Sequence, residues 1–136
     1  MSEDIVWEKS LNCAAGLAKS EHKLILAAFF SPTCEPCIKM KKCTLITESV
    51  QEYIKKYFIS LKYESGTDAD QFMRFDVTAE PAIIVLDSEG NEIFRKIGYY
   101  EPDTFIEKLE KARKKAAHIA AGKQAQQKTH KEVFGA

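Results

Sequence analysis

The sequence lacks a long apolar run, because no window reaches the roughly 18 consecutive apolar residues of a membrane-spanning helix. Its first ten residues, MSEDIVWEKS, also lack the basic and then apolar layout of a secretory signal. We therefore expect no membrane association and a cytoplasmic location for the chain as given. A leader removed from a longer chain would make it an exported protein instead.

An excess of charge of either sign is also missing, since 20 Lys and Arg balance 20 Asp and Glu. The charges are unevenly placed: residues 107–136 hold 8 Lys and Arg against 3 Asp and Glu, so the remainder of the chain is acidic. An acidic body argues against general nucleic-acid binding. We expect a monomer with one domain over residues 1–121 and a basic, mobile tail over residues 122–136.

Cysteine is scarce, with four in 136 residues, and in a reducing cytosol four thiols do not make a disulfide framework. Two of them, Cys34 and Cys37, form a Cys-x-x-Cys pair in the segment SPTCEPC. A structural zinc would need two further ligands, and neither Cys13 nor Cys43 belongs to a second ligand pair. The spacing therefore predicts redox chemistry without a metal or an organic cofactor.

Hydrophobic periodicity and turn residues predict an ordered series of elements. The expected helices are 4–19, a helix from the cysteine pair to residue 57 with a kink at 44–47, 69–75, and one from Pro102 that frays past Gly122; the expected strands are 24–30, 58–63, 82–86 and 92–97. This order predicts an α/β fold in which a βαβ unit and a hairpin form a mixed four-stranded sheet, flanked by helices on both faces, with a C-terminal helical extension.

The two cysteines are expected to differ in reactivity. Cys34 falls where a buried strand ends and a helix begins, where backbone N–H groups and the helix dipole stabilise a thiolate. It is therefore the predicted nucleophile. Cys37, one turn further on, is better shielded and is placed to resolve a mixed disulfide. Pro36 fits the first helical turn, where no N–H group has an acceptor within the helix.

The strand before SPTCEPC, the helix after it and the later segment VTAEPAIIVLDSEGNEIFRKIGYY together resemble thioredoxin over about residues 5–112. The similarity is greatest to the subgroup with the C-terminal domains of thiol:disulfide interchange proteins. Members of that subgroup have a Trp-bearing helix before the first strand and a C-x-x-C-x-x-M pattern, here Cys34, Cys37 and Met40. The resemblance implies that Pro81 is a cis-proline facing the pair and that the backbone of Glu80 pairs with an extended substrate.

Several positions depart from the thioredoxin pattern. Thr33 replaces a Trp, Glu35 with Pro36 replaces Gly-Pro, and Ala28 replaces the buried acid that assists proton transfer at the resolving thiol. Glu35 and Glu80 are the candidates to carry that proton, although Glu35 could equally be an exposed acid of the first helical turn. Both carboxylates would oppose a thiolate at Cys34, which favours electron donation and hence a reductase.

Two further residues have interpretations of their own. Lys62 occupies the place of a thioredoxin lysine that partners the missing acid, so we interpret it as a solvated lysine near the end of a strand. Cys43 lies about 240° round a helix from Cys37 and so faces away from the pair. We interpret it as a buried structural thiol, with a regulatory thiol or a bond to Cys13 as alternatives.

The predicted function is that of a thiol:disulfide oxidoreductase that reduces protein disulfides through Cys34 attack and Cys37 resolution. Its electron donor would be a thioredoxin-reductase-like protein or another thiol donor. An alternative is a thioredoxin-fold binding module in which the cysteine pair is a redox switch. In an exported protein the role would shift to periplasmic disulfide reduction or cytochrome maturation.

Overall fold

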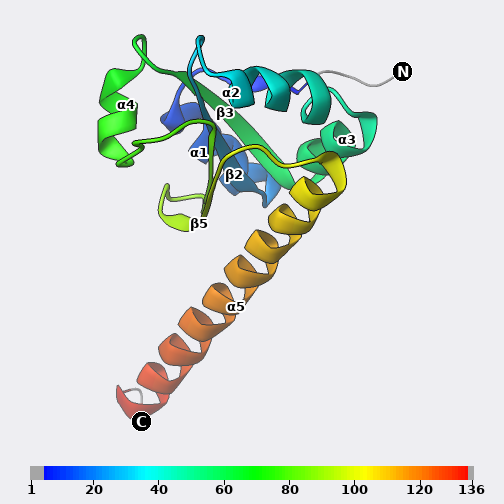
Figure 1. Cartoon of the computed structure of the whole chain (residues 1–136). Helices are drawn as coiled ribbons and strands as arrows, with labels where there is room; N and C mark the ends of the chain where they lie inside the picture. Colours follow the sequence, from blue (N-terminus) through cyan, green and yellow to red (C-terminus); the bar gives the residue numbers. More distant parts are fainter. Residues whose placement is uncertain (1–4, 135–136) are drawn as a thin grey trace.

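The computed structural model describes the backbone of residues 5–134 and side chains as far as Lys123. The helices are α1 (Leu11–Glu21), α2 (Glu35–Lys39), the π-helix η1 (Met40–Thr44), α3 (Glu48–Tyr57), α4 (Ala69–Arg74) and α5 (Pro102–Phe134). The strands are β1 (Trp7–Glu8), β2 (Leu24–Phe30), β3 (Phe58–Glu64), β4 (Ala82–Leu86) and β5 (Glu92–Ile97). Figure 1 shows the sheet between its helices, with α5 running away from the body.

The sheet is mixed and has the strand order β1-β3-β2-β4-β5. Strand β2 pairs parallel with β3 and antiparallel with β4, and β4 continues antiparallel into β5. Six of the seven β2 residues are buried, as the unbroken apolar run LILAAFF predicts for a strand covered on both faces. The sequence-based expectation of a mixed sheet with helices on both faces is confirmed.

The sequence predicted four strands and a first helix over residues 4–19, and both expectations are wrong near the N-terminal end of the chain. Trp7 lies in a fifth strand, β1, and pairs in parallel with Ser60 of β3. Helix α1 begins only at Leu11, because the Ser10 hydroxyl accepts the backbone N–H of Cys13 at 3.1 Å and caps the helix. The expected Trp-bearing helix is therefore an edge strand followed by a shorter helix.

Alternate residues of the strands point into two apolar layers. One layer, beneath α2, η1, α3 and α5, includes Phe30, Cys37 and Phe105. The other, beneath α1 and α4, is built around Phe29, whose ring centroid lies 5.1 Å from that of Phe72. Cys37 is therefore part of a packed core, which holds its helix firmly against the sheet.

The helix that follows the cysteine pair is interrupted, as its predicted kink at 44–47 indicated. The π-helix η1 ends at Thr44 and α3 begins at Glu48. The fully buried Thr44 hydroxyl donates to the backbone carbonyl of Tyr100 at 2.6 Å. This bond joins η1 to the loop before α5, so the helical segment that follows the cysteine pair and the C-terminal helix are fixed to each other.

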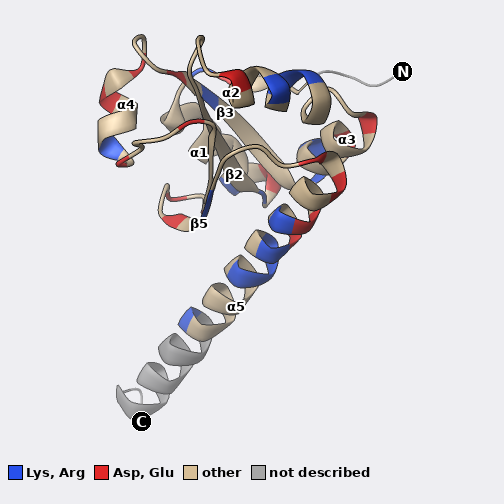
Figure 2. Ribbon diagram, viewed as in Figure 1, with Lys and Arg blue, Asp and Glu red and all other residues tan. Residues whose placement is uncertain are grey.

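Helix α5 continues without a break through Gly122, where the sequence predicted fraying. Figure 2 shows that Lys and Arg are concentrated along the part that leaves the body. Whether residues 122–136 form a mobile tail stays a prediction, since the side chains from residue 124 lie outside the described residues. Within the described chain, no helix has the length and apolar character that crossing a bilayer requires.

Candidate active site

Cys34 stands at the junction between β2 and α2. It is the N-cap of α2, with extended backbone angles of φ −88° and ψ 117°, and its Sγ accepts the backbone N–H of Cys37 at 3.1 Å. The side chain is half-buried, so a substrate sulfur can reach it. Because the N–H group points at the sulfur, a negative charge on Cys34 would be stabilised locally.

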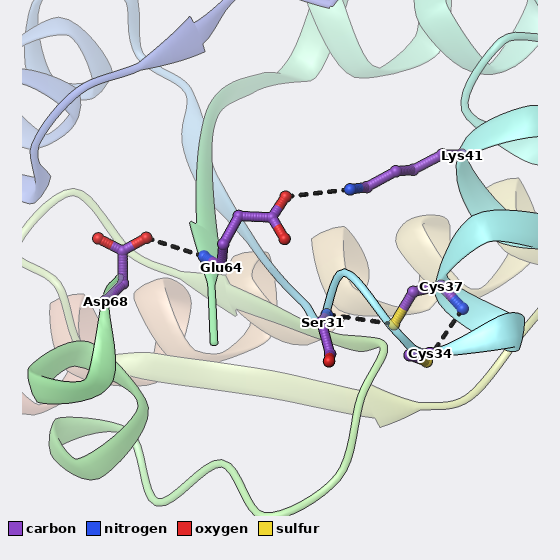
Figure 3. Close-up of polar contacts among 6 residues, drawn as sticks. All are labelled: Ser31, Cys34, Cys37, Lys41, Glu64 and Asp68. Atoms are coloured by element: carbon purple, nitrogen blue, oxygen red, sulfur yellow. Dashed lines mark hydrogen bonds and ion pairs between the residues drawn. The ribbon is translucent and has the colours of Figure 1, made fainter. Parts of the chain in front are cut away.

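Cys37 is fully buried, and its Sγ accepts the backbone N–H of Ser31 at 3.5 Å (Figure 3). Burial is the main cause that raises the pKa of this thiol from its ordinary value of 9.0 to about 12. The hydrogen bond with Cys34 and the negative charge of Glu80 raise the pKa further, whereas the Ser31 N–H lowers it. Cys37 therefore remains a thiol at neutral pH.

The segment before β4 lies against the sulfur of Cys34. The peptide bond between Glu80 and Pro81 is cis. The Cys34 thiol donates to the Glu80 carbonyl oxygen at 3.5 Å, and the Gly98 N–H donates to the Pro81 carbonyl at 2.8 Å. These contacts bring together residues 34, 80 and 81, which the sequence analysis had assigned to one site.

The remaining predicted site residues surround Cys34. Thr33, Glu35 and Pro36 are exposed, with Glu35 and Pro36 in the first turn of α2. The Thr33 hydroxyl lies 3.4 Å from the hydroxyl of Ser31. Ala28 is fully buried, so the core position on β2 indeed offers no carboxylate.

Comparison with known proteins identifies the family of this chain. A family model described as a thioredoxin-like domain matches residues 11–113. The chain belongs to the thioredoxin-like family. A solved structure of DsbH oxidoreductase has a TM-score of 0.71 at 20% identity, with 83% of this chain and 87% of that chain covered. The fold is accordingly the thioredoxin fold, here with a five-stranded sheet and a C-terminal helical region.

The thioredoxin-like domain is also related to disulfide interchange proteins. The thiol:disulfide interchange protein DsbD of Haemophilus influenzae is 26% identical over 100 residues, which is 70% of this chain and 17% of DsbD. The chain therefore spans less than a fifth of that relative. The oxidised C-terminal domain of DsbD from Neisseria meningitidis has a TM-score of 0.62 at 19% identity and covers 74% of this chain and 90% of that domain.

The other two cysteines of this thioredoxin-like chain are both exposed. The expectation that Cys43 is a buried structural thiol is therefore wrong. That expectation rested on the usual burial of free cysteines, whereas Cys43 lies in η1, where Met40 and Thr44 occupy the inward positions. No group of three or more His, Cys, Asp or Glu side chains among the described residues is arranged to hold a metal ion.

The sequence analysis missed two contributors to the site. Ser31 acts through its backbone N–H, which any residue except proline could supply, so no side-chain pattern could reveal it. Thr44 holds the Tyr100 carbonyl from a π-helix, and a π turn has no sequence signature comparable to a cap or a proline. Both become visible only in the folded chain.

Proposed function

We propose that this protein is a thiol:disulfide oxidoreductase that reduces disulfides of other proteins. The observation that carries the proposal is the difference between the two thiols. Cys34 is accessible and accepts a backbone N–H, whereas Cys37 is buried and its pKa is raised to about 12. A nucleophile and a resolving thiol need this division of roles.

In the first step the Cys34 thiolate attacks one sulfur of the substrate disulfide. A bond forms between Cys34 and that sulfur, the substrate S–S bond breaks, and the other substrate sulfur leaves as a thiolate. Cys37 then loses its proton and attacks the Cys34 sulfur, which releases the second substrate thiolate. The substrate has gained two electrons, and the chain holds a Cys34–Cys37 disulfide.

The proton of Cys37 needs an acceptor, because Ala28 offers none. We assign this role to Glu80, whose negative charge acts on the Cys37 thiol and whose backbone carbonyl contacts Cys34. Glu35 is exposed on α2 and is assigned no proton. The cycle closes when an external thiol donor, such as a thioredoxin-reductase-like protein, returns two electrons to the disulfide.

The test is reduction of insulin disulfides with dithiothreitol as the electron source. We expect the wild-type chain to accelerate the reaction and Cys34→Ser to abolish the acceleration. Cys37→Ser should accumulate a mixed disulfide with insulin, detectable by mass spectrometry. Cys43→Ser is the matched control, because this thiol is exposed but lies outside the Cys-x-x-Cys pair, and it should react like wild type. Equal loss in Cys43→Ser would contradict the assignment.

The direction of electron flow is tested by the reduction potential of the pair in dithiothreitol redox buffers. A reductase should have a potential near about −270 mV, as thioredoxin does. A value near about −120 to −180 mV would identify an oxidant or isomerase and would overturn the reductase assignment.

A redox switch without turnover is the second candidate, and Ala28 favours it because the core has no carboxylate beside the resolving thiol. A switch would show the two-electron transition of the pair in redox buffers but would leave insulin reduction at the uncatalysed rate. A catalyst would show both.

A further inference from the structure

A pocket with no role in the redox mechanism lies between β1, β3 and the segment that joins η1 to α3. Its volume is about 370 Å³, within the range of small-molecule sites. It is lined by Ile5, Trp7, Phe30, Lys41, Leu45, Ile46, Gln51 and Lys62. We call it the Trp7 pocket.

Gln51 gives the Trp7 pocket an unsatisfied polar group. The side chain is only 4% exposed, and its Oε1 has no hydrogen-bond partner among the described residues. A buried carbonyl without a donor is unfavourable, and most such atoms in folded proteins are paired. Since Gln51 lines the pocket, a hydrogen-bond donor on a bound molecule could satisfy this amide after a small rotation.

Lys62 gives the pocket a positive charge that no carboxylate of the described residues compensates. Its neighbour across the β2–β3 register is Ala28, which has no carboxylate, and its Nζ lies 5.6 Å from the centroid of the Trp7 ring. No carboxylate among the described residues forms an ion pair with Lys62. The second lysine of the pocket, Lys41, is already paired with Glu64 at 3.0 Å.

The remaining walls are apolar, and two of them are aromatic. Trp7 presents a partly exposed ring, the Phe30 ring is fully buried beneath Lys41, and Ile46 is 62% exposed at the rim. A flat apolar body would cover these surfaces. The Lys41 Nζ lies 4.5 Å from the centroid of the Phe30 ring and also pairs with Glu64. These two contacts fix the position of the lysine.

We propose that the Trp7 pocket binds a small aromatic carboxylic acid that also carries a hydrogen-bond donor. The ring lies against Trp7, the carboxylate pairs with Lys62, and the donor satisfies the amide of Gln51. This site is separate from the cysteine pair, so the proposal stands or falls independently of the redox function.

The test uses Trp7, the only tryptophan of the chain, as its reporter. The single indole N–H signal of ¹⁵N-labelled protein is followed while 3-(4-hydroxyphenyl)propanoate is added. For a probe of this size we expect saturable binding with a Kd on the order of 1 mM. The neutral 3-(4-hydroxyphenyl)propanamide should bind about fivefold more weakly, because it cannot pair with Lys62.

Variants separate the two polar contacts. Lys62→Gln should weaken binding of the acid about fivefold and remove the difference between acid and amide. Lys56→Gln is the matched control, because Lys56 also lies over an aromatic ring, that of Tyr57, but lines no wall of the Trp7 pocket. In wild type, 3-phenylpropanoate, which lacks the hydroxyl donor, should bind about fivefold more weakly, and Gln51→Leu should abolish this difference.

Three results would overturn the proposal. One is the absence of a saturable Trp7 shift with the acid, and another is equal binding by wild type and Lys62→Gln. The third is a Trp7 signal that changes with protein concentration alone, because a second copy of the chain would then cover the pocket. The dispersion of the ¹⁵N spectrum of each variant shows whether it is folded, so that a folding failure is distinguished from the loss of one contact.

Discussion

At the scale of single residues, two thiols separated by two positions experience opposite surroundings. Cys34 is half-exposed and lies where a backbone N–H can reach its sulfur, whereas Cys37 is packed into the apolar layer beneath α2. The main cause of the raised Cys37 pKa is the loss of hydration for its charged form. Protonation of Cys37 is therefore determined by the packing of the core as well as by its neighbours in the candidate site.

The raised Cys37 pKa predicts a loss of stability of the reduced protein in alkali. Above pH about 9 the unfolded chain loses this proton while the folded chain keeps it up to about 12, so rising pH favours unfolding. Well below pH 9 both states keep the proton, so the contribution of Cys37 to the free energy of unfolding does not change with pH. Urea unfolding of reduced protein between pH 9 and pH 11 should show a decline that approaches about 1.4 kcal/mol per pH unit.

Cys37→Ala supplies the control for this pH dependence. It should be less stable than wild type by a constant amount but should lack the part of the alkaline decline that belongs to this thiol. Equal slopes for the two proteins would contradict a raised pKa at Cys37. Cys13 and Cys43 are present in both proteins and do not contribute to the raised Cys37 pKa, so they cancel from the comparison.

Glu80→Gln tests the proton acceptor. If the Glu80 carboxylate takes the proton from Cys37, this variant should resolve a preformed mixed disulfide about a hundredfold more slowly at neutral pH. Quenched-flow release of the substrate thiol measures the step, and Glu35→Gln is the control that should leave it unchanged. Faster resolution in Glu80→Gln would mean that the charge only opposes the Cys37 thiolate.

The residues of the candidate active site and of the Trp7 pocket differ in how far the sequence alone could predict them. Cys34 and Cys37 were predicted from the spacing of the two thiols, whereas Pro81 was predicted only through the resemblance to thioredoxin. Gln51 was not found, because an amide on a helix becomes an unpaired buried group only when β1 and β3 pack beside it. Ser31 was missed because its contribution is a backbone group.

At the scale of elements, the bond from Thr44 to the Tyr100 carbonyl fixes the end of η1. Both groups come from segments that carry the site: η1 continues the cysteine helix, and Tyr100 follows the Gly98 loop that bonds to Pro81. The π-helix thus has an identifiable role, which is to bring a buried hydroxyl to an otherwise free carbonyl.

Thr44→Val removes this hydroxyl with little change in shape. The Tyr100 carbonyl would lose its donor, so we expect the free energy of unfolding to fall by about 1–3 kcal/mol. Urea unfolding measures the change. Thr67→Val, at an exposed turn position, should stay within about 0.5 kcal/mol of wild type, and an equal loss in both variants would contradict the role of the bond.

Elements with strong patterns were predicted well, and those that depend on tertiary pairing were not. Strands β2, β4 and β5 have the bounds that their apolar runs and the hairpin turn indicated. Strand β1 has two residues and exists only through its pairing with β3, so no periodicity could mark it. The helical spacing of the apolar residues around Trp7 was a coincidence, because the Ser10 cap starts the helix only at Leu11.

At the scale of the whole molecule, α5 has two parts with different roles. Phe105, Leu109 and Ala112 are buried against the sheet, and from Ala117 to Lys123 every side chain is exposed. The 33-residue helix is about 50 Å long, longer than the contact it makes with the body. Core packing therefore depends on the first part alone.

Removal of residues 122–136 should leave the free energy of unfolding within about 0.5 kcal/mol of the full chain. Leu109→Ala in the full chain should cost about 2–5 kcal/mol, because it opens a cavity in the core. Thermal unfolding and insulin reduction of both proteins measure these effects. A large loss on truncation would show that the basic end packs on the body and would reject the predicted domain boundary at residue 121.

Both edges of the sheet are poor templates for another chain. On one side the edge strand β1 is only two residues long, and on the other β5 carries Arg95 and Lys96 beside an irregularity in its pairing with β4. Short, charged or irregular edges disfavour the addition of a foreign strand. Extended segments of other chains are therefore not recruited into this sheet, so the fold resists aggregation through its own edges.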